Sequence, residues 1–276
     1  MSKRATRRPP LLDAAPTPRG PRAARQPSAR SRIVKAKVAG RHDRLGRTEV
    51  FAVMRRVIAG EPAALLGLER FEHTDLDELR AAVTEVWGWN SDEPVVSIEP
   101  DRLLDGLIAA RERVLDVSRR GGSVLVATGR PASLLPLHQH FARMARAAGG
   151  HVLDSGEAGP IRAAGRAAVW SWWVGGVAVL TDGDVLLADP GIEAFDELLF
   201  TVPYPDLVVA DRGYAGGALR AGIEVVALAD IDAIALGLAA RRGLPVTMVP
   251  LQERRPAAAY GALETLLSLP PSSQST

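Results

Sequence analysis

The sequence predicts an α/β fold: a mainly parallel sheet flanked by helices, with an N-terminal helical cap and a disordered basic tail. Short apolar runs rich in β-branched residues, without polar alternation, are typical of strands buried on both faces. Segments with helical spacing of apolar residues separate these runs, as in successive βαβ units. The four predicted strands of the sheet are Ser123–Ala127, Leu207–Ala210, Ile223–Leu228 and Val246–Val249.

The length and composition limit the number of domains and the chemistry. A chain of 276 residues can form one large or two small α/β domains. We divide it into a disordered tail (1–40), a helical cap (45–120) and an α/β domain that carries the site (121–270). The sequence contains no Cys, which excludes disulfides and thiolate metal sites.

The charge is distributed unevenly. Residues 1–44 hold 13 Lys and Arg but two Asp, whereas the remaining residues hold 21 Lys and Arg and 30 Asp and Glu. The tail is rich in Pro, Arg and Ala without an apolar period, so we expect disorder. Its cations could contact nucleic-acid phosphates, but no aromatic residue is interleaved for stacking, and a solvated extension is the simpler interpretation.

The sequence shows no membrane or export signal. No apolar run approaches the roughly 20 residues of a spanning helix, and the N-terminus has no signal-peptide core. We therefore expect a cytoplasmic protein with no membrane partner.

The cap region predicts three helices. The first runs from Thr48 to Gly60, the second follows a capping box of Thr74 and Asp77, and the third starts near Pro100. Nothing in this region assembles catalytic chemistry, so we expect it to pack beside the sheet.

The α/β domain adds shorter elements around the sheet. His151–Leu153 predicts a further strand, and the Asp182-Gly183 pair predicts a hairpin within residues 161–188. Trp170, Trp172 and Trp173 could stack on a ring, but we favour a core-edge aromatic cluster. The remaining helices are expected at 131–149, 192–200, 213–222 (a turn and a short helix), 234–241 and 256–269.

Polar residues follow three of the predicted parallel strands. Because ligands of open parallel sheets bind beyond the carboxyl ends of the strands, we expect these residues on one rim. A Thr-Gly turn before a helix can hold a phosphate with backbone N–H groups, and the guanidinium of Arg130 adds a planar donor fork. The signal is weak, since the turn is neither G-x-G-x-x-G nor a P-loop, and each Asp could simply cap the next helix. The candidates are Thr128, Gly129, Arg130, Asp211, Arg212, Gly213, Asp230 and Asp232.

The histidines carry little signal in the sequence. His138 and His140 are two residues apart in a predicted helix and point to different faces, so they cannot chelate one ion together. We interpret them as surface or core-edge residues. His42 and His73 have no chemical context.

Four blocks of the chain resemble, in order across residues 45–270, a family of mainly actinobacterial proteins known as phosphatases. The resemblance implies phosphate-ester hydrolysis by a cytoplasmic α/β protein, without fixing a substrate. The blocks are ATGRPASLLPLHQHFARMARAAGG, VGGVAVLTDGDVLLADP, PDLVVADRGYAGGALRAGIEVVALADID and VPLQERRPAAAYGAL.

This chain departs from the family at the positions of interest. The family pattern reads G-T-G-H-P, H-T-H-S-P, G-D-H-G-W and D-T-N-D-P, whereas residues 127–131, 186–190, 210–214 and 230–234 read ATGRP, LLADP, ADRGY and DIDAI. Every His of the pattern is therefore absent, which removes the usual metal ligand and the usual general acid near neutral pH.

Two functions remain open. In the first, the chain hydrolyses a small phosphorylated metabolite: Asp211, Asp230 and Asp232 hold Mg²⁺, Asp211 and Arg212 are catalytic, and Arg130 helps to clamp the phosphate. In the second, it is a catalytically inactive paralogue that binds a phosphorylated or anionic small molecule.

Overall fold

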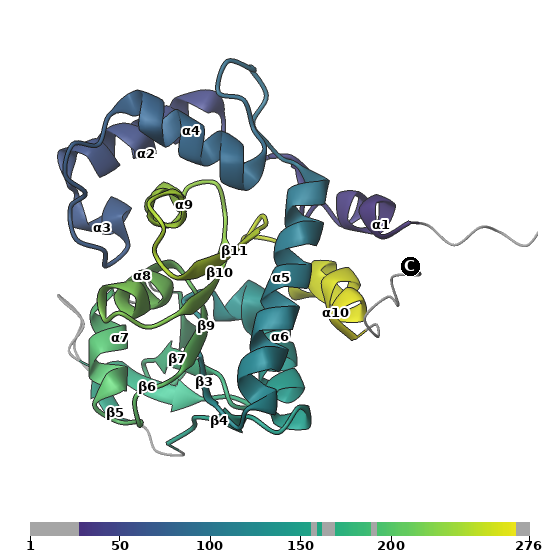
Figure 1. Ribbon diagram of the computed structural model, residues 1–276, viewed down its shortest axis with the longest axis vertical. Helices are drawn as coiled ribbons and strands as arrows, with labels where there is room; N and C mark the ends of the chain where they lie inside the picture. The colour runs from purple at the N-terminus through teal and green to yellow at the C-terminus, as the bar shows by residue number, and fades with distance from the viewer. Residues whose placement is uncertain (1–27, 156–158, 162–168, 189–191, 269–276) are drawn as a thin grey trace, which may run out of the picture.

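The computed structural model describes residues 28–155, 159–161, 169–188 and 192–268 (Figure 1). The predicted tail before Ser28, the predicted turn at 189–191 and the last eight residues lie outside this range. A five-stranded sheet forms the centre, in the order β11 (Val246–Pro250), β10 (Val225–Ala229), β9 (Leu207–Asp211), β3 (Ser123–Val126) and β4 (His151–Val152). All four pairings are parallel, so the predicted fold class is confirmed.

Helices cover both faces of this sheet. α5 (Pro100–Arg119) and α6 (Pro131–Ala147) lie on one face, and α8 (Arg212–Arg220) and α9 (Ile234–Arg241) lie on the other (Figure 1). Every residue of β9 and β10 is buried, which explains why these runs are apolar without alternation. Such a doubly wound sheet reverses its strand order at one point, here between β3 and β9.

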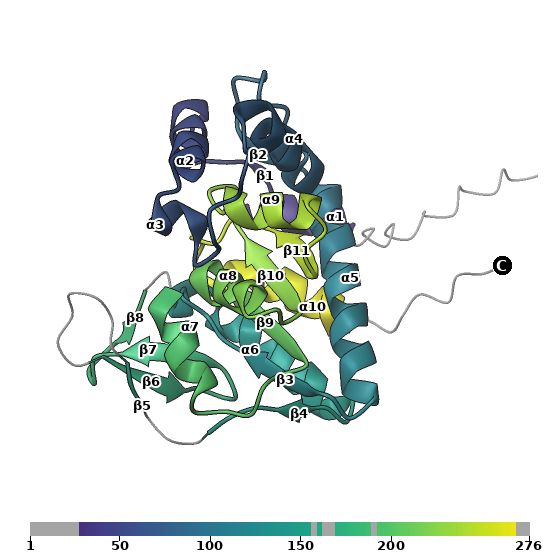
Figure 2. The same cartoon turned by 60° about the vertical axis from the view of Figure 1, so that its left-hand side comes forward.

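The cap helices lie together at one end of the molecule, next to α9 (Figure 2). They are α2 (Arg47–Ala59), α3 (Pro62–Leu65) and α4 (Leu76–Trp87). Trp87 at the end of α4 donates its indole N–H to the carbonyl of Ala229, at 3.1 Å. The cap is therefore hydrogen-bonded to the end of β10. The cap of α4 itself is Asp75, which accepts the N–H of Glu78, so the predicted capping box at Thr74 is wrong.

A second, antiparallel sheet adjoins the parallel one. It consists of β5 (Gly159–Ile161), β6 (Val169–Trp173), β7 (Ala178–Thr181) and β8 (Leu186–Leu187), followed in the chain by α7 (Ile192–Leu199). The predicted hairpin at Asp182-Gly183 joins β7 to β8. The N–H of Thr128 donates to the carbonyl of Ala178 at 3.0 Å, so this sheet supports the turn after β3.

Residues 28–40 are folded, so the predicted disordered tail ends too late. They form α1 (Ala29–Lys35) and lead into β1 (Gly40–Arg41), which pairs with β2 (Ser97–Ile98). Ser28 caps α1, and the side chains of Ile33 and Val38 are fully buried. The many Arg and Lys residues of this segment made it read as a polar tail, although α1 has an apolar face. This face packs against α5 and α10 (Gly261–Ser268). A 3₁₀ turn, Ala257–Tyr260, precedes α10. In the described part of the chain, no helix is long and apolar enough to cross a membrane.

Candidate functional site

Six of the eight predicted site residues lie where the strand order of the parallel sheet reverses, and Asp230 and Asp232 follow the adjacent strand β10. The turn Thr128–Arg130 follows β3, and the junction of Asp211 with Arg212 follows the neighbouring β9. In doubly wound sheets the crevice at such a reversal is the usual place for a ligand. The topology therefore places the Thr-Gly turn and Asp211 together, as expected.

Asp211 holds the turn after β3. One carboxylate oxygen, Oδ2, accepts a short hydrogen bond from the hydroxyl of Thr128, and Oδ1 accepts the N–H of Gly129 at 2.8 Å. The N–H of Arg130 in turn donates to the Thr128 hydroxyl oxygen at 3.0 Å. Asp211 makes no side-chain bond to its own helix, so the alternative that it merely caps α8 is wrong.

Arg212 directs its guanidinium at two carboxylates. Its Nη1 donates to Asp232 Oδ1 at 3.2 Å and to Glu253 Oε2 at 3.0 Å. Burial alone would lower the pKa of Arg212, but the charges of Glu253 and Asp232 raise it above its usual value. The backbone of Arg212 has a φ of 48°, a left-handed conformation that costs energy in a residue with a side chain. Gly213 is buried in the next position of α8.

Glu253 is the central residue that sequence analysis missed. It is fully buried in the loop after β11, where its Oε1 accepts the N–H of Asp230 at 3.1 Å and its Oε2 lies 3.5 Å from Nε of Arg130. Burial raises the pKa of Glu253 to about 7, and the charge of Arg212 opposes this shift. The strand-end rule that selected the aspartates would also have selected this loop, because β11 is parallel to β10.

Two histidines without a sequence signal also belong to the site. Nε2 of His42 lies 3.0 Å from Oδ1 of Asp230. His138 is fully buried in α6, where its Nδ1 lies 3.0 Å from the carbonyl of Leu134 and its Nε2 lies 3.8 Å from Asp211 Oδ2. Desolvation lowers the pKa of His138, and Asp211 partly opposes this. The interpretation of His138 as a surface or core-edge residue is therefore wrong.

Arg130 and Arg212 lie close together because both approach the same oxygen of Glu253. Their side chains are 20% and 12% exposed, and that of Asp232 is 15% exposed, whereas Asp211 and Glu253 have no exposed side-chain area. A ligand entering from solvent would thus meet the two guanidiniums and Asp232 first. Arg254, 3.7 Å from Asp232 Oδ2 and 45% exposed, adds a further cation at the edge.

The carboxylates of the site already accept hydrogen bonds: those of Asp211, Asp230 and Glu253 from backbone N–H groups, and those of Asp232 and Glu253 from Arg212. Among the described residues, no group of three or more His, Asp or Glu side chains has the arrangement of a metal site. Nη1 of Arg212 lies between Asp232 and Glu253, where it would repel a metal cation. In this arrangement the predicted ligands Asp211, Asp230 and Asp232 do not fit Mg²⁺ unless Arg212 moves.

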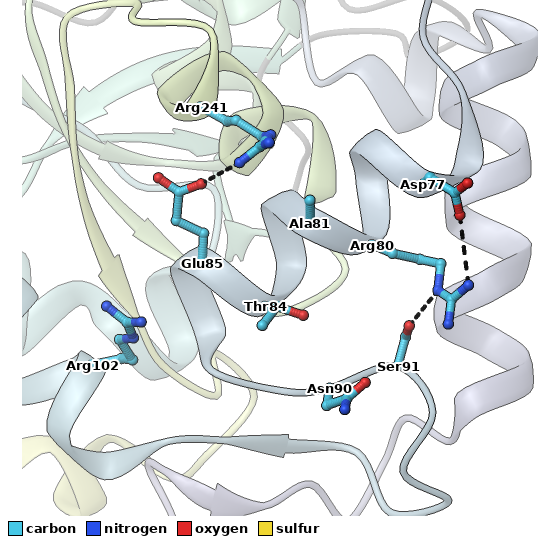
Figure 3. Close-up of a pocket in the computed structure, with 9 residues that line it drawn as sticks. All are labelled: Asp77, Arg80, Ala81, Thr84, Glu85, Asn90, Ser91, Arg102 and Arg241. Carbon is cyan, nitrogen blue, oxygen red and sulfur yellow. Dashed lines mark hydrogen bonds and ion pairs between the residues drawn. The ribbon is translucent and has the colours of Figure 1, made fainter.

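A separate hollow of about 480 Å³ lies at α4, α9 and the start of α5 (Figure 3). Two of its arginines are paired with acidic residues of the lining: Arg241 bonds Glu85 at 2.7 Å, and Arg80 lies 3.6 Å from Asp77. In the described part of the chain, no hydrogen bond or ion pair joins these residues to Arg130 or Arg212.

The fold and site define an α/β protein in which two arginines meet a buried carboxylate at the carboxyl ends of parallel strands. The chain belongs to the Phosphatase family, whose model matches residues 24–268. It is 31% identical over 209 residues to a Streptomyces coelicolor protein named Phosphatase SCO2771, an alignment that covers 72% of this chain and 78% of that relative.

Proposed function

We propose that this protein hydrolyses the phosphate monoester of a small molecule at the partly exposed side chains of Arg130 and Arg212, a proposed binding pocket. Family membership supports the reaction class. The observation that carries the proposal is the convergence of the two guanidiniums on one oxygen of Glu253, beside the Thr128–Arg130 turn. Two positive forks at one point, next to the start of α6, suit a doubly charged phosphate group.

The arginines would bind phosphate by exchanging partners. In the free protein they share the buried carboxylate of Glu253, and Arg212 also contacts Asp232. A phosphate in the pocket would accept hydrogen bonds from the exposed sides of both guanidiniums. The turn held by Asp211 would keep its place, because Asp211 bonds backbone and hydroxyl groups rather than the ligand.

Hydrolysis needs charge stabilisation and a proton acceptor. A water molecule attacks phosphorus, the ester P–O bond breaks, and the products are inorganic phosphate and an alcohol that takes a proton from solvent. The guanidiniums of Arg130 and Arg212 stabilise the oxygens of the transferring phosphoryl group. Asp232 is the partly exposed carboxylate beside Arg212 and is the proposed acceptor of the water's proton.

Mg²⁺ remains a prediction for this site. Bound to Asp211, Asp230 and Asp232, it would supply a Lewis acid for the phosphoryl oxygens. The position of Arg212 argues against that arrangement, and the arginines supply positive charge without a metal.

A second candidate function is binding without catalysis. It is favoured by one observation: Asp211 and Asp230 already accept hydrogen bonds at both oxygens and have almost no exposed area, so neither can readily act on a water molecule. Under this alternative the pocket binds a phosphorylated or anionic small molecule through its arginines.

A panel of phosphorylated metabolites tests the proposal. Purified protein is assayed for phosphate release with Mg²⁺, with Mn²⁺ and with chelator, and inorganic phosphate binding is measured by calorimetry. Turnover that survives the chelator supports arginine-based hydrolysis, and turnover that needs the metal supports the Mg²⁺ prediction. If Asp211 holds Mg²⁺, Asp211→Asn should abolish turnover without unfolding the protein. If Asp232 accepts the proton without a metal, Asp232→Asn should lower turnover about a hundredfold. Asp105→Asn, which changes an exposed carboxylate on α5, should leave turnover unchanged in either case. Phosphate binding without turnover of any ester would favour the second candidate.

A further inference from the structure

We infer that His42, which precedes the helical cap in the chain, is a positioning residue of the pocket: through Asp230 and Glu253 it sets the place of Arg212. The inference rests on the proposed function only in assuming that the arginines bind phosphate. It assigns a role to a residue 170 positions away from Arg212 in the sequence.

The contacts of His42 fix its tautomer. Its Nδ1 lies 3.1 Å and 2.9 Å from the backbone nitrogens of Arg44 and Leu45, both of which donate an N–H. Nδ1 must therefore present its lone pair and carry no hydrogen. The ring proton is on Nε2, which donates to Oδ1 of Asp230 at 3.0 Å.

Asp230, held by His42, is in turn joined to Glu253 by two hydrogen bonds. Its Oδ2 accepts the N–H of Glu253, and its own N–H donates to Oε1 of Glu253, both at 3.1 Å. The other oxygen of Glu253 accepts Nη1 of Arg212 at 3.0 Å. An unbroken series of hydrogen bonds thus leads from His42 to the guanidinium.

The hydrogen bonds between His42, Asp230 and Glu253 are buried, so the loss of one should shift the side chains that follow it in the series. The side chain of His42 is 2% exposed and that of Asp230 is 6% exposed, so bulk water cannot readily replace a lost bond. The ring of His42 bonds Asp230 and the backbone of Arg44 and Leu45, and among the described residues it has no hydrogen bond or ion pair with Arg130 or Arg212. Its influence on the pocket must pass through Asp230.

The backbone around His42 is fastened to the loop of Glu253. Gln252 donates its N–H to the carbonyl of Val38 at 2.9 Å and its side-chain N–H to the carbonyl of Arg41 at 3.1 Å. Arg255 donates to the carbonyl of Lys37 at 2.9 Å. These bonds hold the segment in place even when the imidazole is replaced, so a substitution at His42 tests the side chain itself.

Two substitutions separate the two nitrogens of His42. The amide oxygen of Asn occupies roughly the place of Nδ1, so His42→Asn keeps the acceptor for Arg44 and Leu45 and loses the donor to Asp230. The amide nitrogen of Gln reaches roughly the place of Nε2, so His42→Gln keeps the donor and loses the acceptor. If His42 positions Asp230, His42→Asn should weaken phosphate binding more than His42→Gln does. If His42 only supports its own loop, His42→Gln should weaken phosphate binding more.

The experiment measures inorganic phosphate binding by calorimetry for the full-length wild type, His42→Asn, His42→Gln, Arg212→Gln and the double variant His42→Asn/Arg212→Gln. We expect His42→Asn to weaken phosphate binding about tenfold, the order of coupling found between residues of one hydrogen-bond network. We expect His42→Gln to stay within about threefold of the wild type. In the Arg212→Gln background, His42→Asn should have almost no further effect, because the residue it positions is gone.

Each other outcome contradicts the inference or its premise. If the wild type does not bind phosphate, the proposed pocket itself is wrong. If the wild type binds but His42→Asn binds equally well, the pocket stands and the role of His42 is wrong. A tenfold loss that persists in the Arg212→Gln background would show that the effect does not pass through Arg212. Should His42→Asn fail to fold, His42→Gln decides, since a folded His42→Gln protein with a tenfold loss would contradict the inference.

Discussion

Asp230 and Glu253 bond each other's backbone: each donates its N–H to the other's carboxylate, both at 3.1 Å. The reciprocal pair joins the ends of the adjacent parallel strands β10 and β11. Two acidic side chains this close would repel each other, and the N–H donors, His42 and Arg212 offset that repulsion. The pair therefore holds the carboxylate of Glu253 in place, and this carboxylate accepts the hydrogen bond that positions Arg212.

Replacing either arginine should weaken phosphate binding. For Arg130→Ala or Arg212→Ala we expect a loss of about 1.5–3 kcal/mol, the range for a hydrogen bond to a charged group. Calorimetry with inorganic phosphate measures the loss. Arg241→Ala is the matched control, because it removes an arginine paired with Glu85 outside the pocket and should leave the affinity unchanged. Equal losses in all three variants would indicate non-specific electrostatics.

The stability of the protein should depend on the protonation of Glu253. Burial raises its folded-state pKa to about 7, above the unfolded value of 4.5, so the folded state holds its proton more tightly. This contribution to stability is complete below pH 4.5 and is lost as the pH rises through 7. We expect the free energy of unfolding of the wild type, relative to Glu253→Gln, to fall between pH 5 and pH 8. Urea titrations at each pH measure this free energy. If it changes with pH in the same way in both proteins, the pKa of Glu253 is not raised.

The contribution of His138 to stability should depend on pH in the opposite direction, increasing as the pH rises. Its folded-state pKa is lowered by burial, so the unfolded chain takes up a proton near pH 6.5 that the folded protein resists. The stabilising effect is present above pH 6.5 and is lost as the pH falls below it. His138→Gln should therefore lose less stability than the wild type between pH 7 and pH 5. A loss as large as in the wild type would mean that His138 is protonated beside Asp211.

Two truncations test the boundary of the tail. Removing residues 1–27, a polar and Pro-rich segment, should leave the thermal midpoint within about two degrees. Removing residues 1–40 should lower it by more than about five degrees, because Ile33 and Val38 lose their buried positions and each is worth about 1.5–3 kcal/mol. Differential scanning calorimetry of both truncated proteins measures the midpoints. Equal midpoints would show that α1 does not contribute to stability.

Local sequence patterns were sufficient for the sheet and for part of the site. The strands are short apolar runs buried on both faces, and such runs can be recognised without knowledge of their neighbours. The rule that ligands gather at the carboxyl ends of parallel strands then selected Thr128, Asp211, Arg212 and Asp230, which contacts in the structure bring together. The chemical roles of these residues stay predictions.

The sequence by itself determined the fold class, the strands and the rim on which the polar residues lie, because those features follow from periodicity and from the direction of parallel strands. Only the tertiary structure decided the partners of each charge. His42 and His138 have no local signal, and the only signal for Glu253 is its place after a parallel strand. The roles of all three arise from contacts with residues 188, 73 and 23 positions away. Burial then converts these long-range contacts into pKa shifts and fixed hydrogen bonds, which depend on the packed environment and cannot be read from neighbours in the chain.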